Sequence, residues 1–349
     1  MLDFYRDKRV LITGHTGFKG SWLCRILLNA GAKVSGYALE PATRPALFNI
    51  LRLERSMPSV VADVRDLSRL KQAIGEVKPE IVMHLAAQPL VLESYRDPVG
   101  TYATNVMGTV NLLEACRHTD FIRSIVNVTT DKVYENKEWV WGYREDENLC
   151  GYDPYSNSKS CSELVTYSYR RAFYADPASP ALSTARAGNV IGGGDFADHR
   201  IIPDGVRALK KGEAMVIRHP NSIRPYQHIL DCLSGYLTLA KMQYENPSLA
   251  GNYNFGPSAD SCVTTENIVR LLGEQWGDGA TYRIQPSGGA HEANCLKLDI
   301  SKAEAVLGWR PRWNVKTAIE KVVEWEKFCP ENGDAVGIID RQISAYFTA

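Results

Sequence analysis

Short apolar runs, mostly β-branched, alternate with longer amphipathic segments along the first 190 residues of the chain. The pattern predicts strands over residues 9–14, 32–39, 59–63, 80–87, 122–130 and 183–190. The intervening segments predict helices over residues 20–30, 66–77, 95–118 and 154–175. Such alternation is typical of an α/β fold in which crossover helices connect the strands of a parallel sheet. The run 80–87 has almost no polar interruption, which indicates a strand covered on both faces.

The alternation ends near residue 190, where loops rich in glycine, proline and polar residues separate single helices. We expect helices over residues 228–244 and 264–275, and a strand over 252–257 that returns to the first sheet. The chain is therefore predicted to form a doubly wound parallel sheet with a smaller, mixed α/β domain. The first domain is expected to comprise residues 1–189 and 228–258, and the second residues 190–227 and 259–349.

Composition narrows the class of ligand. The 349 residues carry 40 Lys and Arg against 40 Asp and Glu, with no basic block, so we expect a small-molecule ligand and neither nucleic acid nor membrane as a partner. No apolar run approaches the ~18 residues of a membrane span, and the first ten residues are charged where a signal peptide would be apolar, so we expect a cytoplasmic protein. The eight cysteines show no paired spacing, which predicts reduced thiols and no metal site.

Three glycines, Gly14, Gly17 and Gly20, lie between the first predicted strand and the helix that follows it. In this context the first permits a tight turn, the second lets a pyrophosphate approach the backbone, and the third allows close packing of the helix on the strand. The helix N-terminus adds free amides and partial positive charge. A strand-to-helix turn without a ligand is the alternative, but the order of strand, loop and helix favours a dinucleotide site.

The end of the second predicted strand, residues 36–39, contains no Asp or Glu to hold a ribose 2′-hydroxyl. Lys19 is placed to reach the ribose instead, so the loop by itself leaves the choice between NAD and NADP open. Asp63, after the third predicted strand, is placed to meet the adenine amine.

A tyrosine and a lysine, Tyr155 and Lys159, lie four residues apart at the start of a predicted helix. Asp153 is the expected helix cap, and Pro154 fits the first turn. The two side chains therefore share one helix face. Because a cation beside a phenol favours the phenolate, we expect Tyr155 to act as a base near neutral pH. An exposed surface pair is the alternative, and the neighbouring residues decide between the two.

Four residues with polar or ionisable side chains, Thr129, Thr130, Asp131 and Lys132, lie at the end of the fifth predicted strand and just beyond it. This is the carboxyl edge of the sheet, where open α/β folds bind their ligands. Two hydroxyls, an acid and an amine are costly to bury for packing alone. A capping turn would explain Thr130 and Asp131, but it would not explain the tyrosine and lysine downstream.

The glycine loop, Thr130 and the pair Tyr155 and Lys159 together resemble the extended short-chain dehydrogenase/reductase family, which has a Rossmann-type fold. Within it the chain is similar to sugar-nucleotide 4,6-dehydratases of the CDP-glucose group over nearly its whole length. The segments that carry this resemblance are GHTGFKGSWL (14–23), HLAAQPLV (84–91), TNVMGTVNLLEA (104–115), TTDKVYENKEWVWGYRE (129–145), CGYDPYSNSK (150–159), RAGNVIGGGD (186–195) and KLDISKAEAVLGWRPRW (297–313).

The resemblance implies a hydro-lyase that converts CDP-D-glucose to CDP-4-keto-6-deoxy-D-glucose with tightly bound NAD, in deoxysugar biosynthesis such as that of lipopolysaccharide O-antigen. Tyr155, with Lys159 and Thr130, removes the 4-hydroxyl proton while hydride leaves C4 for NAD. A base then takes the C5 proton, Asp131 protonates the departing C6 hydroxyl, and the hydride returns to C6. Related dTDP-glucose enzymes have glutamate after the aspartate. We hypothesise that Lys132 is the C5 base here, provided that burial or a neighbouring cation lowers its pKa.

Positions that match the family motifs assign further ligand contacts. The cofactor positions are Gly14, Thr16, Gly17, Phe18, Lys19, Gly20, Asp63, Val64, Leu85, Ala86, Ala87, Asn105, Tyr155 and Lys159. Asn189 and Arg224 match positions that grip the substrate diphosphate. The weaker substrate candidates are Ile202, Pro203, Arg218, Tyr226 and His291. Tyr226 or His228 could equally be a core residue. The resemblance also implies a homodimer or homotetramer, held together by a bundle of helices 95–118 and 154–175.

Two other functions stay open from the residues alone. A nucleotide-sugar 4-epimerase would share the tyrosine, the lysine and a transient 4-ketone, but it needs no acid and base for elimination, and Asp131 and Lys132 argue against it. A non-catalytic NAD sensor on the same fold could dispense with Tyr155 and Lys159, so their presence favours an enzyme.

Overall fold

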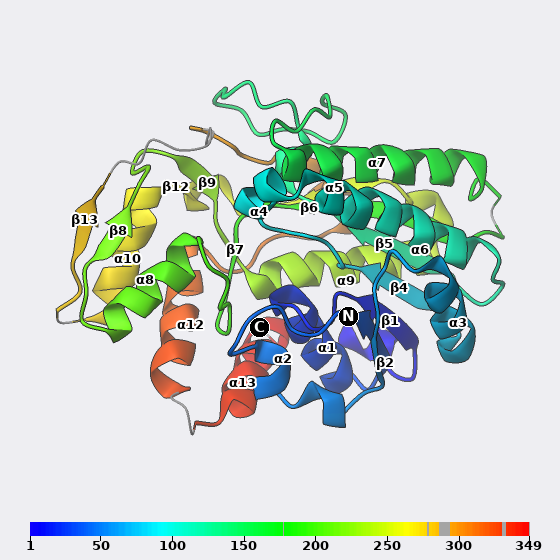
Figure 1. Ribbon diagram of the computed structural model, residues 1–349, viewed down its shortest axis with the longest axis horizontal. Coiled ribbons are helices and arrows are strands. Elements are labelled where there is room, and N and C mark those ends of the chain that lie inside the picture. The colour runs from blue at the N-terminus through cyan, green and yellow to red at the C-terminus, as the bar shows by residue number, and fades with distance from the viewer. Residues whose placement is uncertain (177, 278, 286–293, 330–332, 349) are drawn as a thin grey trace.

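A seven-stranded sheet forms the centre of the larger part of the molecule (Figure 1). The structure is a computed structural model that describes residues 1–176, 178–277, 279–285, 294–329 and 333–348. The strands of this sheet, all parallel to their neighbours, lie in the order β11, β6, β5, β4, β1, β2, β3. Their bounds are β1 Arg9–Thr13, β2 Lys33–Ala38, β3 Ser59–Val61, β4 Ile81–His84, β5 Ser124–Val128, β6 Ala181–Ala187 and β11 Asn252–Phe255. The doubly wound, Rossmann-type parallel sheet predicted from the sequence is confirmed.

The order of the strands reverses at β1, which pairs with β2 on one side and with β4 on the other. In open α/β sheets, ligands bind at such a switch point, beyond the carboxyl ends of the strands. The glycine loop that follows β1 and the loop that follows β4 both lie at this point. The predicted return of residues 252–257 to the sheet is also confirmed, because β11 pairs with β6.

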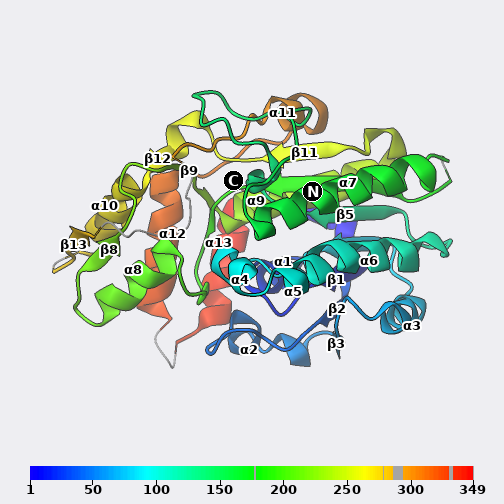
Figure 2. The same cartoon turned by 45° about the horizontal axis from the view of Figure 1, so that its top comes forward.

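Helices cover both faces of the sheet, as Figure 2 makes clear. Apolar side chains of α1 (Phe18–Asn29) and α9 (Ile229–Glu245) pack on one face, against Val10, Ile12 and Met83. On the other face, α3 (Leu67–Val77), α6 (Gly108–Arg117) and α7 (Pro154–Ala172) pack with Leu11 and Val82. Successive side chains of β1 thus enter two different cores, which accounts for the unbroken apolar runs in the sequence.

The helix expected over residues 95–118 is interrupted in the structure. α4 (Val91–Arg96) ends before Asp97, whose carboxylate caps α5 (Pro98–Tyr102) by accepting a hydrogen bond from Gly100 N at 2.8 Å. The physical reason is Pro98, which has no N–H to donate and disfavours helical backbone in the residue before it. From α5 the helix continues into α6 through one wider π turn, residues 103–107.

The strand expected over residues 80–87 is also shorter than predicted, since β4 ends at His84. The one expected over 183–190 divides into β6 and the two-residue β7 (Val190–Ile191). The residues released from the sheet, 85–87 and 188–189, are loops at its carboxyl edge. These loops carry several of the predicted ligand contacts.

A smaller region contains three short strand pairs and three helices. β7 pairs with β10 (Gln227–His228), β8 (Met215–Ile217) with β13 (Tyr282–Ile284), and β9 (Ile223–Pro225) with β12 (Cys262–Thr264). α8 (Ile201–Lys210), α10 (Thr265–Trp276) and α12 (Val315–Phe328) enclose a separate apolar core with these strands.

The end of the chain contributes to the core of the larger region. α11 (Ser301–Leu307) and α13 (Ala335–Thr348) place Ala303, Ile339 and other apolar residues in the cluster that contains Trp22 of α1. The Asp340 carboxylate accepts a hydrogen bond from Arg25 Nε at 2.7 Å. The predicted assignment of residues 259–349 to the smaller domain does not describe this packing. The contact of α13 with α1 joins segments far apart in the sequence, and such a contact leaves no local sequence signal.

All eight cysteines are free thiols, as predicted. Within the described ranges, no group of histidine, cysteine or acidic side chains is arranged to hold a metal ion. No helix there combines the length and the apolar character that crossing a lipid bilayer would require.

Candidate active site

A cavity of about 1900 Å³ lies along the carboxyl edge of the sheet, between the sheet and the smaller region. Residues beyond the ends of β1, β4, β5 and β6 line one side of it, and residues of α8, β8 and β9 line the other. All the predicted catalytic residues line this cavity: Thr130, Asp131, Lys132, Tyr155 and Lys159. Two clusters that are at least 23 residues apart in the sequence thus meet in one place.

The glycine loop forms one end of the cavity and has the shape that a dinucleotide requires. Gly14 has a φ of +74°, and a Cβ on it would lie 2.7 Å from Ala86 N. A Cβ on Gly20 would collide with the carbonyl oxygen of Gly14, so this glycine sets the approach of helix to strand. Gly17 caps α1 and lines the cavity, so the first amides of that helix point to a place where a pyrophosphate would bind. The residues present therefore fit NAD.

The adenosine end of the cavity contains both expected and unexpected residues. Asp63 lines it, as predicted, but its carboxylate accepts hydrogen bonds from Arg65 Nε at 2.9 Å and Nη2 at 2.6 Å. This ion pair holds the pKa of Asp63 below its ordinary value. Glu40, two residues beyond β2, is exposed and also lines the cavity. Residues 36–39, which contain no acid, end one residue before Glu40.

The remaining residues of the predicted cofactor set fall into two groups. Thr16, Phe18, Lys19, Val64, Leu85, Ala86 and Ala87 all line the cavity. Asn105 is buried below it: its Oδ1 accepts from Gln88 N at 2.8 Å, and its Nδ2 donates to Ser158 Oγ at 2.9 Å. Asn105 therefore ties the loop after β4 to α7, so any role it has toward the cofactor is indirect.

Tyr155 lies in the first turn of α7, where Asp153 accepts a hydrogen bond from Ser156 N at 3.0 Å. Burial raises the pKa of Tyr155 to about 12, and a hydrogen bond with the Thr130 side chain opposes this rise. This direction is opposite to the lowering of the tyrosine pKa that was expected beside Lys159. Thr130, which was predicted to act beside Tyr155, does contact it.

Lys159 is buried, and its Nζ donates a hydrogen bond to the carbonyl oxygen of Val128 at 3.1 Å. Burial, together with the nearby charge of Lys19, lowers the pKa of Lys159 to about 8. The ammonium is held by the end of β5, and among the described contacts it makes none with the Tyr155 phenol. This position is the physical reason why the predicted lowering of the tyrosine pKa does not occur here.

The turn formed by residues 130–132 begins directly after β5 and is capped by the Thr130 side chain. The Asp131 carboxyl is buried, and Oδ1 accepts from Thr130 Oγ1 at 3.0 Å while Oδ2 has no hydrogen-bond partner among the described atoms. Burial raises the pKa of Asp131, against the influence of Lys132 and Arg224. A carboxyl that resists ionisation is suited to donate a proton.

Two further features of this turn concern the space around Asp131 and the position of Lys132. A Cβ on Gly188 would lie 2.9 Å from Asp131 Oδ2, so the glycine leaves room for the acid. The Lys132 side chain is half-buried and lines the cavity, as a C5 base would have to.

Most of the predicted substrate contacts lie on the far side of the cavity. Its lining includes Asn189, Ile202, Pro203, Arg218, Arg224 and Tyr226. Arg224 is almost fully buried, and its Nη1 donates to the Ile223 carbonyl at 2.9 Å. Tyr226 also belongs to the core of the smaller region, and His228 is a buried cap of α9, so the core interpretation applies to both. His291 lies outside the described residues.

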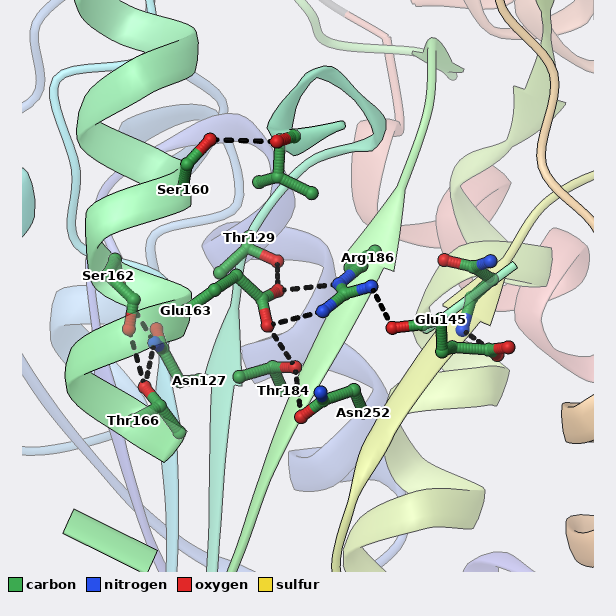
Figure 3. A network of polar contacts seen from close by, with 12 residues as sticks. Asn127, Thr129, Glu145, Ser160, Ser162, Glu163, Thr166, Thr184, Arg186 and Asn252 are labelled. Carbon is green, nitrogen blue, oxygen red and sulfur yellow. Dashed lines mark hydrogen bonds and ion pairs between the residues drawn. The ribbon is translucent and has the colours of Figure 1, made fainter. Parts of the chain in front are cut away.

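A buried polar network behind the cavity was missed by the sequence analysis. Figure 3 shows Glu163 of α7 pointing to Arg186 and Thr184 of β6 and to Thr129 at the end of β5. The available signal was spacing: Glu163 follows Lys159 by four residues on the same helix, so the two lie on one face.

Comparisons with known proteins agree with this geometry. The family described as GDP-mannose 4,6-dehydratase matches residues 11–322. A curated CDP-glucose 4,6-dehydratase of Salmonella typhimurium is 48% identical, over 99% of this chain and 98% of the relative. A solved dTDP-glucose 4,6-dehydratase of Streptomyces venezuelae with NAD bound shares the fold, with a TM-score of 0.79 and 24% identity over 94% of this chain and 99% of its own.

The fold by itself does not separate dehydratases from epimerases. A solved UDP-glucose 4-epimerase of Thermus thermophilus in complex with NAD has a TM-score of 0.79 and 25% identity, over 91% of this chain and 99% of its own. The family match and the 48% identical relative distinguish a dehydratase from an epimerase. The chain belongs to the GDP-mannose 4,6-dehydratase family of NAD-dependent sugar-nucleotide enzymes.

Proposed function

We propose that the protein is an NAD-dependent CDP-glucose 4,6-dehydratase, a hydro-lyase that yields CDP-4-keto-6-deoxyglucose and water. One observation carries the proposal: the acid-bearing turn 130–132 and the pair Tyr155 and Lys159 line the same cavity as a dinucleotide loop. The 48% identical relative, a CDP-glucose 4,6-dehydratase, supports the choice of substrate. An epimerase would need the tyrosine and lysine, but it would have no use for a buried carboxyl of raised pKa beside them.

In this proposal Tyr155 accepts the proton of the sugar 4-hydroxyl, and the Thr130 hydroxyl stabilises the developing phenolate. The glycine loop after β1 would hold NAD, which would supply the hydride acceptor for C4 and the hydride donor for C6. A positive charge is needed near Tyr155, because burial raises the pKa of the phenol to about 12. Lys19 and Lys159 are two cations that line the cofactor side of the cavity.

Elimination of water requires an acid at C6 and a base at C5 of the sugar. We assign the acid to Asp131, because burial keeps its carboxyl protonated to a higher pH than usual. We assign the base to Lys132, the next residue in the turn, whose half-buried amine lines the same cavity.

The diphosphate is expected to bind between the smaller region and the sheet. Arg224, Arg218 and Asn189 line that part of the cavity, and a guanidinium binds phosphate oxygens bidentately. Ile202 and Pro203 of α8 offer apolar contact to the nucleoside.

We also propose that the protein works in the cytoplasm as a homodimer or homotetramer. α5 and α6 pack beside α7, and this layer exposes large apolar side chains, including Val99 (79% exposed), Leu164 (54%) and Met107 (51%). Figure 2 shows these helices lying next to one another on one side of the molecule. A second copy of the layer would cover both apolar faces in a symmetric bundle.

The proposal is tested in four separate reactions, in which the protein together with NAD is incubated with CDP-, UDP-, dTDP- or GDP-glucose. A 4-keto-6-deoxy product absorbs in the near ultraviolet in alkali, whereas an epimerised sugar does not. We expect the product with CDP-glucose at the highest kcat/KM. Product formation with another nucleotide sugar and none with CDP-glucose would contradict the substrate assignment.

A further inference from the structure

A fully buried carboxylate lies directly behind the candidate active site, on the helix that carries Tyr155 and Lys159. The Glu163 side chain is 1% exposed. Its Oε1 accepts hydrogen bonds from Arg186 Nε at 2.9 Å and Thr129 Oγ1 at 2.5 Å, and its Oε2 accepts from Arg186 Nη2 at 2.9 Å and Thr184 Oγ1 at 2.7 Å. Four donor atoms, three from β6 and one from Thr129 just after β5, therefore converge on one side chain of α7 (Figure 3).

The network reaches the 130–132 turn from both sides. Thr129 immediately precedes the turn in the chain. Arg186 Nη1 donates to Tyr134 Oη at 2.7 Å, just after the turn, and to the Glu145 carbonyl at 3.1 Å. The turn with its acid is thus held between two residues that both connect to Glu163.

Stability alone is a poor explanation for this arrangement. Taking two charges out of water costs several kcal/mol per ion, and buried ion pairs are often no more stabilising than apolar side chains of similar size. Burial by itself would raise the pKa of Glu163, but Arg186 and the hydroxyl donors hold it below its ordinary value. The site therefore keeps a charge where an apolar core would serve packing as well.

We propose that Glu163 and Arg186 are a positioning pair that fixes the 130–132 turn relative to Tyr155, with the Thr129 hydroxyl as the link. Neither residue lines the cavity, so they act through their neighbours. The inference rests on the proposed function, since it assigns the relative placement of the C6 acid and the C4 base. A misplacement of about 1 Å between reacting groups costs about 10²-fold in rate.

Two matched substitutions separate positioning from stability. Thr129→Val and Thr184→Val each remove one hydroxyl that donates to Glu163, and each leaves an Arg186 bond on the same carboxylate oxygen. Both residues are buried, and valine has nearly the shape of threonine. Only Thr129 adjoins the turn, whereas Thr184 lies within β6.

We expect both variants to lose the same few degrees of Tm and to bind CDP, measured by calorimetry, as the parent does. Thr129→Val should lower kcat on CDP-glucose by about 10-fold to 10²-fold with little change in KM. Thr184→Val should keep kcat within about twofold of the parent, and Thr129→Ser, which retains the hydroxyl, should recover most of the parent kcat.

Equal loss of kcat in both valine variants, or parent kcat in Thr129→Val, would overturn the inference. A parent protein that forms no 4-keto-6-deoxy product from CDP-glucose would instead overturn the proposed function. The two failures are distinguished by which protein loses activity.

Discussion

The Asp131 and Lys132 side chains are neighbours in sequence, but the account gives them separable tasks. Asp131→Asn has no proton to donate to the departing C6 hydroxyl, so kcat should fall by at least about 10²-fold. The preceding steps need no acid at C6. We therefore expect the variant still to exchange the C5 hydrogen of CDP-glucose for deuterium in heavy water, as followed by NMR.

Lys132→Ala serves as the counterpart of that variant, because it removes the base and leaves the acid. It should lose both product formation and deuterium uptake at C5. Uptake at the parent rate in Lys132→Ala would remove the lysine from the mechanism, and a parent-like kcat in Asp131→Asn would remove the aspartate.

Lys159 shows how the site sets function against stability. Burial lowers its pKa from 10.5 to about 8, so below pH 8 the folded protein holds an ammonium that its surroundings disfavour. Lys159→Met should abolish activity and yet raise the free energy of unfolding at pH 7 by about 1–2 kcal/mol, since the Val128 carbonyl loses a donor and offsets part of the gain.

The sign of this effect can be checked against pH. Between pH 8 and 10.5 the unfolded parent binds a proton at Lys159 that the folded parent does not, so parent stability rises with pH in this window. The advantage of Lys159→Met, measured by denaturant unfolding, should shrink over the same range. A variant less stable than the parent at pH 7 would contradict the account.

At the scale of elements, α7 combines the chemistry with the proposed assembly. One face carries Tyr155, Lys159 and Glu163, and another exposes Leu164 beside Tyr167. Leu164→Arg should place a charge in the proposed bundle and shift the protein to the monomer, as measured by light scattering after gel filtration. The matched control is Val306→Arg on α11, which is 40% exposed and lies outside that layer. A Leu164→Arg variant with the same mass as the parent assembly would exclude this face as the interface.

Elements governed by local chemistry were predictable from the sequence. β1, the glycine loop and α1 could be predicted because their glycines meet local requirements. Gly14 adopts a positive φ and Gly20 tolerates no side chain, and both constraints act within a few residues. The break before Pro98 has an equally local cause, and the prediction of one helix over 95–118 overlooked it.

Features governed by distant contacts were not predictable in this way. The sequence placed Lys159 on the same face as Tyr155, but the carbonyl of Val128 decides where its ammonium lies. The Glu163 network depends on Thr129, Thr184 and Arg186, which meet it only after β5 and β6 pair beside α7. Sequence spacing predicted that the two reactive clusters lie at one edge of the sheet, whereas the pKa values of their side chains depend on burial in the tertiary structure.

At the scale of the whole molecule, a chain with no net charge is expected to bind two diphosphates in one cavity. Positive potential is supplied where it is needed, by the α1 N-terminus, Lys19, Lys159 and Arg224, all of which reach the cavity. In the proposed function the two regions divide the binding, with the cofactor expected on the sheet side of the cavity and the nucleotide on the other.

The central claim is that hydrogen removed from C4 of the sugar ends on C6 of the same molecule. The most direct measurement uses CDP-glucose deuterated at C4, with the position of deuterium in the product read by NMR. The account predicts a 4-keto-6-deoxy sugar that carries the deuterium in its C6 methyl group. Deuterium retained at C4 of a recovered or epimerised sugar, with no methyl group formed, would contradict it.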